Sequence, residues 1–164
     1  QDLIDRMAKM NICPSVNAGI VAKNGGSYMR FYGERNKYFG ALKSMIEAGI
    51  KCSLQSDSPS GPYGFECIDG AVNRYDRVRN VQCDTTQAVS LMEAIRIATI
   101  NGAYGSFEED IKGSLENGKL ADMIVLDRDI LEMDKFDLYK VKVDLTMIDG
   151  EICYVRDEVK GEFK

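Results

Sequence analysis

The stretch GSLENGKLADMIVL, residues 113–126, marks a change in the pattern of the sequence. Before it, apolar residues recur at helical spacing between short apolar runs, and after Gly118 they alternate with polar residues. Helical spacing indicates amphipathic helices, whereas strict alternation indicates strands with one buried face. We therefore place a boundary near residue 118, between an α/β segment, residues 1–118, and an all-β segment, residues 119–164.

The segment before the boundary is predicted to alternate helices and strands. Leu3 and Met7 are one helical turn apart, and Gly49 is suited to end a second helix because glycine adopts the left-handed backbone easily. Ser90 and Glu93 form a capping box at the start of a third helix. This alternation is typical of α/β proteins with parallel strands. The predicted helices span residues 2–10, 38–46 and 91–102, and the predicted strands span residues 12–16 and 50–56.

Two glycine-rich stretches of this segment are predicted as loops. Residues 17–30 contain the pair Gly25-Gly26, and residues 57–70 are rich in Ser, Gly and Pro. Such residues usually interrupt regular structure. A short helix is predicted to follow the second loop, at residues 71–79.

The segment after the boundary is predicted to form strands at residues 121–126, 140–148 and 151–155. Val141, Val143, Leu145 and Met147 alternate with polar residues, which places them on one face of the second strand. Asp149-Gly150 between the last two strands is typical of a two-residue hairpin turn. For Asp122, just before the apolar run of the first strand, we expect a local structural role.

The composition excludes several classes of protein. Of 164 residues, 45% are apolar and 29% are charged, as in soluble globular proteins. The net charge is −5 and the basic residues are scattered, which argues against binding nucleic acid. No apolar run approaches the ~20 residues that span a bilayer, and residues 1–6 do not resemble a signal peptide. We therefore predict no membrane partner, and the unpaired cysteines indicate a reducing, cytoplasmic location.

The cysteines and the missing histidines limit the chemistry further. The five cysteines include no Cys-x-x-Cys pair, so neither a disulfide framework nor a zinc ribbon is expected. Cys13, Cys52 and Cys153 lie in apolar runs, where a thiol packs as a small apolar group. The chain has no histidine, which excludes Ser-His-Asp and Cys-His catalysis. A complete zinc hydrolase without histidine would be very unusual.

The sequence resembles the amidohydrolase superfamily, and within it the predicted amidohydrolases that include N-substituted formamide deformylases. The resemblance covers essentially the whole chain. Its most specific part is Gly-Ser-Leu-Glu-Asn-Gly-Lys-Leu-Ala-Asp at residues 113–122. The other matching stretches are Glu-Ala-Ile-Arg at 93–96, Thr-Ile-Asn-Gly-Ala-Tyr at 99–104, Val-Leu-Asp-Arg-Asp at 125–129, Gly-Glu-Arg at 33–35, Ala-Gly at 48–49, Ser-Asp-Ser-Pro at 56–59 and Ala-Val-Asn-Arg at 71–74.

The resemblance implies a (β/α)8 TIM barrel with a small β-sandwich built from both ends of the chain. Residues 1–118 would be the last part of the barrel, from the helix after strand six to the final helix. Residues 119–164 would be the C-terminal strands of the sandwich. The resemblance therefore implies the same boundary that the residue pattern predicts.

Asp57 is the candidate catalytic residue and the candidate metal ligand. It follows the predicted strand 50–56, and catalytic groups of barrels collect at the C-terminal ends of strands. By resemblance, an aspartate after strand eight binds or neighbours a divalent metal, zinc in our prediction, and takes a proton from the attacking water. The alternative is a structural one, because an Asp before Ser-Pro also suits a turn.

The other candidate site residues are weaker. Ser56 and Ser58 could orient Asp57 through hydrogen bonds, or could be turn residues. Tyr63, Phe65 and Arg74 could line a substrate pocket, or could have surface or packing roles. Asn17 stands where related sequences tend to carry a Gln-Pro segment, and this difference puts the contribution of strand seven to the pocket in doubt.

The resemblance implies further ligands that this chain lacks: a His-x-His pair, a bridging Lys or acidic residue, and two more histidines. We therefore interpret the chain as an inactive C-terminal fragment of a hydrolase of non-peptide C–N bonds in small amide-type substrates, oligomeric when full-length. We expect its strands at 12–16 and 50–56 to expose apolar surface. The alternative is a non-catalytic part-barrel module used for assembly, since open strand edges invite association. A dinucleotide-binding domain is disfavoured because no Gly-x-Gly-x-x-Gly follows a strand.

Overall fold

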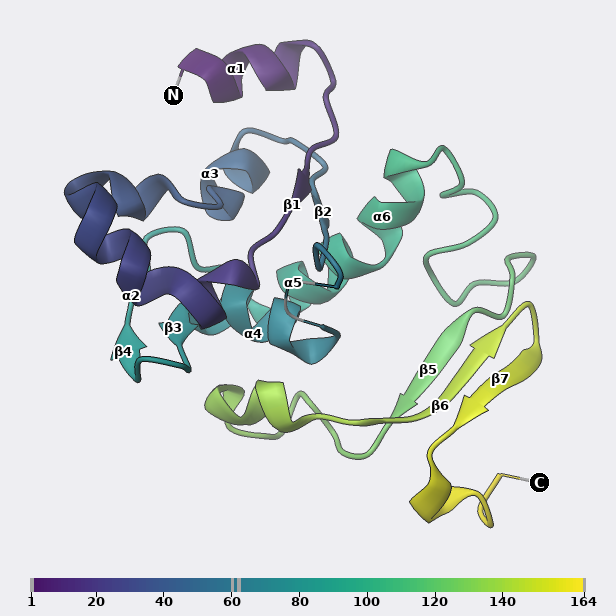
Figure 1. Ribbon diagram of the computed structural model, residues 1–164. Coiled ribbons are helices and arrows are strands. Elements are labelled where there is room, and N and C mark those ends of the chain that lie inside the picture. The colour runs from purple at the N-terminus through teal and green to yellow at the C-terminus, as the bar shows by residue number, and fades with distance from the viewer. Residues whose placement is uncertain (1, 60, 62, 164) are drawn as a thin grey trace.

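The computed structural model describes residues 2–59, 61 and 63–163 (Figure 1). Four residues lie outside the described ones. They are residue 1 of the predicted segment 1–118, residue 164 of the segment 119–164, and residues 60 and 62 of the predicted loop 57–70. The helices are α1 (Asp2–Lys9), α2 (Ile20–Tyr32), η1 (Gly33–Tyr38), α3 (Leu42–Glu47), α4 (Phe65–Asn73), α5 (Leu91–Ala98), α6 (Ile100–Gly105), η2 (Lys135–Lys140) and η3 (Asp157–Val159), where η marks a 3-10 helix. The strands are β1 (Ser15–Val16), β2 (Ser53–Leu54), β3 (Tyr75–Asp76), β4 (Val81–Gln82), β5 (Met123–Leu126), β6 (Val143–Ile148) and β7 (Glu151–Val155).

The strands β1 and β2 form a parallel pair among the helices. Ser15 pairs with Ser53 and Val16 with Leu54, which confirms the parallel pairing predicted for the first two strands. Figure 1 shows α2 and α3 to the left of the pair, α6 to its right and α5 beneath it. Both strands are shorter than predicted, since regular pairing begins only after Pro14 and covers two residues in each strand.

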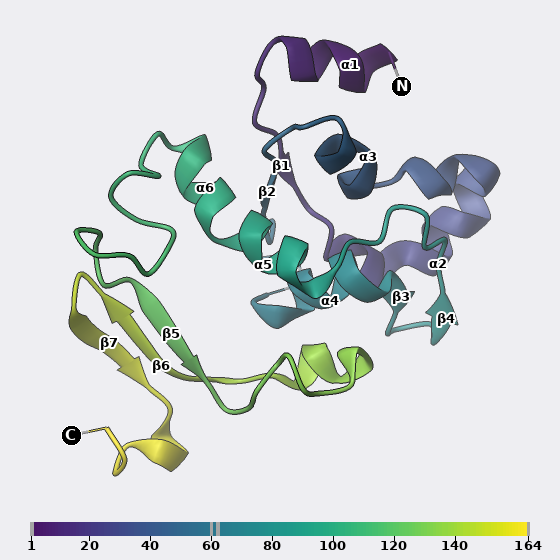
Figure 2. The ribbon, with the colours of Figure 1, turned by 180° about the vertical axis from the view of Figure 1, so that it is seen from behind.

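The strands β5, β6 and β7 form an antiparallel sheet in that order. All three lie within or at the bounds predicted for them, and Asp149 and Gly150 form the turn between β6 and β7 with φ angles of 50° and 80°. Asp122 has the expected local role, because its carboxylate accepts a hydrogen bond from the N–H of Asp149 at 2.8 Å. Figure 2 shows this sheet beside the helical part, with η2 returning beneath α4.

The hydrophobic core is formed mostly by residues before the sheet. Leu138 of η2 is fully buried in it, so the segment between β5 and β6 is fastened to the helical part. Among the described residues of the three strands, Leu145 is the only apolar residue that is buried. The core consists of Ala18, Leu42, Met45, Ile50, Cys52, Phe65, Ile68, Ala71, Val72, Val89, Ala94, Ile97 and Leu138.

The prediction of a loop at residues 17–30 is wrong, because most of this stretch belongs to α2. Its two glycines permit close packing instead of interrupting the helix. A Cβ atom on Gly25 would lie 2.3 Å from the Sγ of Cys83, and one on Gly26 would lie 2.9 Å from the side chain of Arg79. The helix therefore packs closely on the β3–β4 hairpin, and a larger residue would have no room there.

The prediction of a loop over the whole of 57–70 and of a helix at 71–79 is also wrong. The helix α4 begins at Phe65 and ends before Arg74, whose φ of 46° is left-handed. Gly70 lies inside this helix, where a Cβ atom would be 2.6 Å from the Cα of Gly19. The residues that follow form the antiparallel pair β3–β4, which the sequence pattern did not predict.

Two predictions of burial need correction. Ile50 and Cys52 of the predicted strand 50–56 are 6% and 0% exposed, because the helices cover them. Ile12 is 39% exposed, in agreement with the expectation for the first strand. Cys153 lies exposed on β7, not in a core.

The remaining expectations concern disulfides and the membrane. No disulfide bond joins the cysteines in the described part of the chain. None of the helices within residues 2–59, 61 and 63–163 has the length and apolar character needed to cross a bilayer.

Candidate functional site

The C-terminal ends of β1 and β2 lie next to each other. Beyond the strand pair itself, the N–H of Gln55 donates to the carbonyl of Val16 at 3.1 Å. Since the strands are parallel, the residues that follow them emerge at one edge. Asn17 and Asp57 therefore lie on the segments that leave this edge.

Asp57 was predicted to follow directly after a strand at 50–56; since β2 ends at Leu54, it lies three residues beyond the strand. Its side chain is exposed and its backbone is left-handed, with a φ of 58°, a conformation that Asp tolerates better than most residues. The carbonyl of Asp57 accepts a hydrogen bond from the N–H of Gly61 at 2.9 Å. A Cβ atom on Gly61 would lie 1.5 Å from the carbonyl oxygen of Ser56, so only glycine allows this tight return of the chain.

Three side chains hold the segment between β2 and α4: Lys23 and Glu66, which were not predicted as site residues, and the candidate Tyr63. The Nζ of Lys23, from the first turn of α2, donates to the carbonyl of Gly61 at 2.9 Å and lies 4.0 Å from the carboxylate of Glu66. The carboxylate of Glu66 also accepts from the N–H of Tyr63 at 3.2 Å. The hydroxyl of Tyr63 donates to the carbonyl of Pro59 at 2.7 Å. The backbone that carries Asp57 is thus tied to both α2 and α4.

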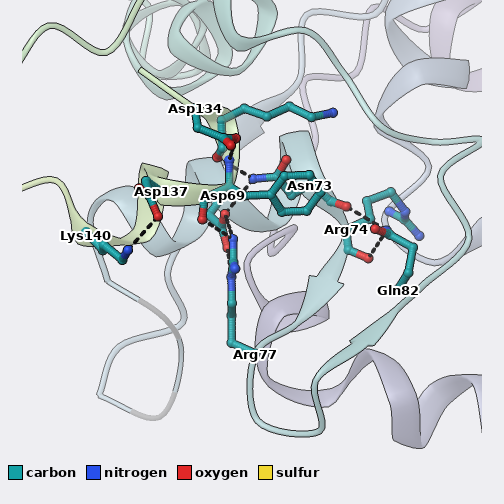
Figure 3. A network of polar contacts seen from close by, with 10 residues as sticks. Asp69, Asn73, Arg74, Arg77, Gln82, Asp134, Asp137 and Lys140 are labelled. Carbon is teal, nitrogen blue, oxygen red and sulfur yellow. Dashed lines mark hydrogen bonds and ion pairs between the residues drawn. The ribbon is translucent and has the colours of Figure 1, made fainter. Parts of the chain in front are cut away.

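A polar network fastens α4 to η2 (Figure 3). Asp69, which is fully buried, receives two hydrogen bonds from the guanidinium of Arg77 at 2.7 and 3.0 Å and one from the amide of Asn73 at 2.7 Å. Arg77 also donates to the carbonyl of Phe136 at 2.8 Å, and Asn73 to that of Lys135 at 2.7 Å. Hydrogen bonding to Asp69 raises the pKa of Arg77. The network therefore fixes the helix that follows Asp57.

The weaker candidates divide between local structure and a small cavity. The side chain of Asn17 accepts a hydrogen bond from the N–H of Ile20 at 3.1 Å, which is a turn at the start of α2. Within the described part of the chain, neither Ser56 nor Ser58 makes a hydrogen bond to the side chain of Asp57. Tyr63 and Phe65 line a cavity of about 270 Å³, together with Gly64, Glu66, Tyr139, Val141 and Val143.

Arg74 does not line a substrate pocket, because its side chain is fully buried. Its guanidinium donates to the carbonyls of Asp84 at 2.6 Å and Phe39 at 3.0 Å. Burial lowers the pKa of Arg74, since the charged form loses hydration. The packing role that the sequence left open for this residue is therefore the one observed.

The described residues do not form a metal site by themselves. Within residues 2–59, 61 and 63–163, no group of three or more His, Cys, Asp or Glu side chains is placed to hold a metal ion. The exposed carboxylate of Asp57 could supply a single oxygen ligand, whereas structural and catalytic zinc sites need at least three protein ligands. A metal bound at Asp57 would need its remaining ligands from elsewhere.

A larger cavity lies away from Asp57. Its volume is about 770 Å³, and it separates α5 and α6 from the first residues of β5. Ile95, Ile100 and Ile124 give it apolar walls, and Asp57 is not among its lining residues. The cavity marks the boundary between the helical part and the sheet.

The model of the family described as "Amidohydrolase family" matches residues 1–154. The chain belongs to this family. It is 34% identical over 154 residues to an N-substituted formamide deformylase from Arthrobacter pascens, a match that covers 92% of this chain and 28% of the deformylase.

Solved structures of metal-dependent hydrolases and of a deaminase have a similar fold. An uncharacterised metal-dependent hydrolase from Pyrococcus horikoshii OT3 superposes with a TM-score of 0.68 and 25% identity, over 82% of this chain and 28% of that one. An adenosine deaminase from Xanthomonas campestris with bound zinc superposes with a TM-score of 0.55 and 23% identity, over 73% and 29%. The chain thus has a mixed α/β structure of the amidohydrolase fold and spans less than a third of the length of these relatives.

Lys23 and Glu66 were not predicted as site residues. Lys23 lies in the stretch that was predicted as a loop, and Glu66 in the stretch predicted to join β2 to the next helix. A charged residue in a supposed surface loop carries no signal of a partner 38 residues away. The contact depends on α2 and α4 lying side by side, which no local pattern indicates.

Proposed function

We propose that the full-length protein is a metal-dependent hydrolase of C–N bonds other than peptide bonds. The substrate would be a small molecule with an amide or formamide carbonyl. Membership in the amidohydrolase family supports the reaction class, and the identity to a formamide deformylase supports the substrate class.

We further propose that residues 1–118 form the last part of a (β/α)8 barrel and residues 119–164 the C-terminal share of a β-sandwich. Support comes from the parallel pair β1–β2, because each strand is followed by a helix, as in barrels. The antiparallel sheet β5–β6–β7, which begins after residue 118, supports the second part.

Asp57 would act at the C-terminal rim of this barrel. The observation that carries the proposal is an exposed carboxylate three residues beyond a parallel strand, in a chain of this family. An ionised carboxylate there can accept the proton of an attacking water and pass it to the leaving nitrogen. Its exposure also leaves it accessible to a substrate.

A divalent metal, zinc in our proposal, would supply the activation of that water. Asp57 would contribute one ligand, and the others would come from polypeptide outside this chain, so the isolated chain would be inactive. We propose the cytoplasm as the location and an oligomer as the assembled form, as the sequence analysis predicted.

The experiment is to replace Asp57 by Asn in the full-length protein and to measure the hydrolysis of a panel of N-substituted formamides and amides. Turnover should fall by about 10⁴-fold or more, because general-base catalysis and metal activation both fail. The folded structure, followed by circular dichroism and thermal unfolding, should change little. Asp110→Asn, an exposed acid after α6, is the matched control and should retain activity.

Wild-type turnover in Asp57→Asn would remove this residue from the mechanism. No hydrolysis by the unmodified full-length protein, with any divalent metal, would favour the alternative of a non-catalytic module used for assembly. The two results are separate, because the first requires an active parent enzyme.

A further inference from the structure

Lys23 occupies an unusual place for a surface lysine. It projects from the first turn of α2, directly after β1, toward the segment that leaves β2. Its side chain is 36% exposed and makes a hydrogen bond at 2.9 Å to the carbonyl of Gly61. A flexible, strongly hydrated ammonium group is rarely held in this way unless several acceptors converge on it.

Several acceptors do converge on Lys23. Besides the carbonyl of Gly61, the carboxylate of Glu66 lies 4.0 Å from the ammonium nitrogen, and the ring of Tyr63 lies 5.9 Å from it. The same Glu66 carboxylate receives the N–H of Tyr63. Lys23 is therefore bound to the middle of the segment and, through Glu66, to the start of α4.

The segment between β2 and α4 connects the contact of Lys23 to the backbone of Asp57. Gly61 binds Lys23 through its carbonyl and binds the carbonyl of Asp57 through its N–H, at 2.9 Å in each case. A shift of Gly61 would therefore shift the backbone of Asp57. Tyr63 restrains the same return of the chain from the other side, through its hydroxyl and the carbonyl of Pro59.

We propose that Lys23 is a positioning residue, which holds the backbone of Asp57 in place through Gly61. This inference deepens the proposed function and rests on it. Lys23 does not act on the substrate itself. Its effect is to keep the carboxylate of Asp57 in the geometry that proton transfer needs.

The test compares Lys23→Met with the unmodified full-length enzyme. Methionine keeps an unbranched side chain but cannot donate to Gly61. We expect kcat to fall by about 10- to 100-fold with KM within about threefold, since a displacement of ~1 Å at a reacting group has effects of this size. Lys43→Met, an exposed lysine on α3, is the matched control and should leave both constants unchanged.

A second variant does not depend on the folding of Lys23→Met, and a second measurement does not depend on activity. Tyr63→Phe removes the bond to Pro59 and should lower kcat in the same direction by a smaller factor. Amide hydrogen exchange should be faster at Gly61 in Lys23→Met and unchanged in Lys43→Met. Both exchange measurements can be made without metal or substrate.

The outcomes distinguish this inference from the proposed function. If Asp57→Asn is inactive but Lys23→Met has wild-type kcat and normal exchange at Gly61, the positioning role is wrong and the proposed function stands. A raised KM with unchanged kcat would make Lys23 a substrate-binding residue and would also overturn the inference. Wild-type activity of Asp57→Asn would remove Asp57 from the mechanism and refute this inference with it, while the proposed hydrolase activity would stand.

Discussion

The sheet β5–β6–β7 and the block formed by α2, α4 and the β3–β4 hairpin are organised by different kinds of interaction. In the sheet, β6 and β7 are joined by a two-residue turn, and the residue pattern predicted each of the three strands. In the block, packing glycines and buried charges join segments that are distant in sequence, and the predicted boundaries failed there. The comparison teaches that local patterns suffice where contacts are local.

The largest effect should come from Asp76 of the block. Its carboxylate is fully buried and accepts hydrogen bonds from the N–H groups of Gly26, Val78 and Arg79 at 2.8–2.9 Å and from the guanidinium of Arg79 at 3.2 Å. Asp76→Ala leaves these donors without their acceptor, and the free energy of unfolding should fall by about 3–5 kcal/mol. Urea denaturation of the protein measures this loss.

Asp122→Ala in the sheet is the matched substitution for Asp76→Ala. Asp122 accepts one hydrogen bond, from the N–H of Asp149 in an exposed turn, so the loss should be about 1 kcal/mol. Equal losses in the two variants would break the comparison, because they would mean that the buried acceptor contributes no more than the exposed one.

An intermediate effect is expected at Gly25 of α2. Gly25→Ala places a methyl group 2.3 Å from the Sγ of Cys83, and the overpacking should outweigh the gain in helix propensity, for a net loss of about 1–2 kcal/mol. Cys83→Ala removes the Sγ atom that the new methyl group meets, so Gly25→Ala should cost much less in that background. A double-mutant cycle in urea measures the interaction energy between the two positions.

Gly102→Ala in α6 is the control for Gly25→Ala. A Cβ atom there meets nothing within 4 Å, so alanine should stabilise the protein by about 0.5–1 kcal/mol through helix propensity alone. If Gly25→Ala also proved stabilising, the glycines of α2 would not be packing glycines, and the account of this helix would be wrong.

Of the two destabilising glycine substitutions, the smaller effect should come from the turn of the sheet. Gly150 has a φ of 80° and open space around it, so Gly150→Ala costs only backbone strain, about 1 kcal/mol. Thermal unfolding of this variant beside Gly161→Ala, a glycine with equal space and no such φ, checks the value. An unchanged melting temperature in Gly150→Ala would show that the turn does not depend on its left-handed residue.

The sequence predicted much of the fold and part of the site. The parallel pair, the capping box of Ser90 and Glu93, and the position of Asp57 beyond β2 were all predicted. The contacts of Lys23 were not, because its partner Gly61 lies 38 residues away, in the segment between β2 and α4. The burial of Arg74 was left open. The order of residues along the sequence does not show whether a charged side chain will find backbone carbonyls to bind inside the protein, as Arg74 does.

The sequence by itself determined the features that depend on residues close along the chain: the alternation of the strands, the Asp149-Gly150 turn, the helix start at Ser90 and the family. Only the tertiary structure decided that residues 20–32 form a helix in spite of two glycines, and that Lys23 binds the segment of Asp57. The physical reason is distance. Periodicity and turn preference are properties of neighbouring residues, whereas close packing and buried hydrogen bonds exist only after remote segments have met.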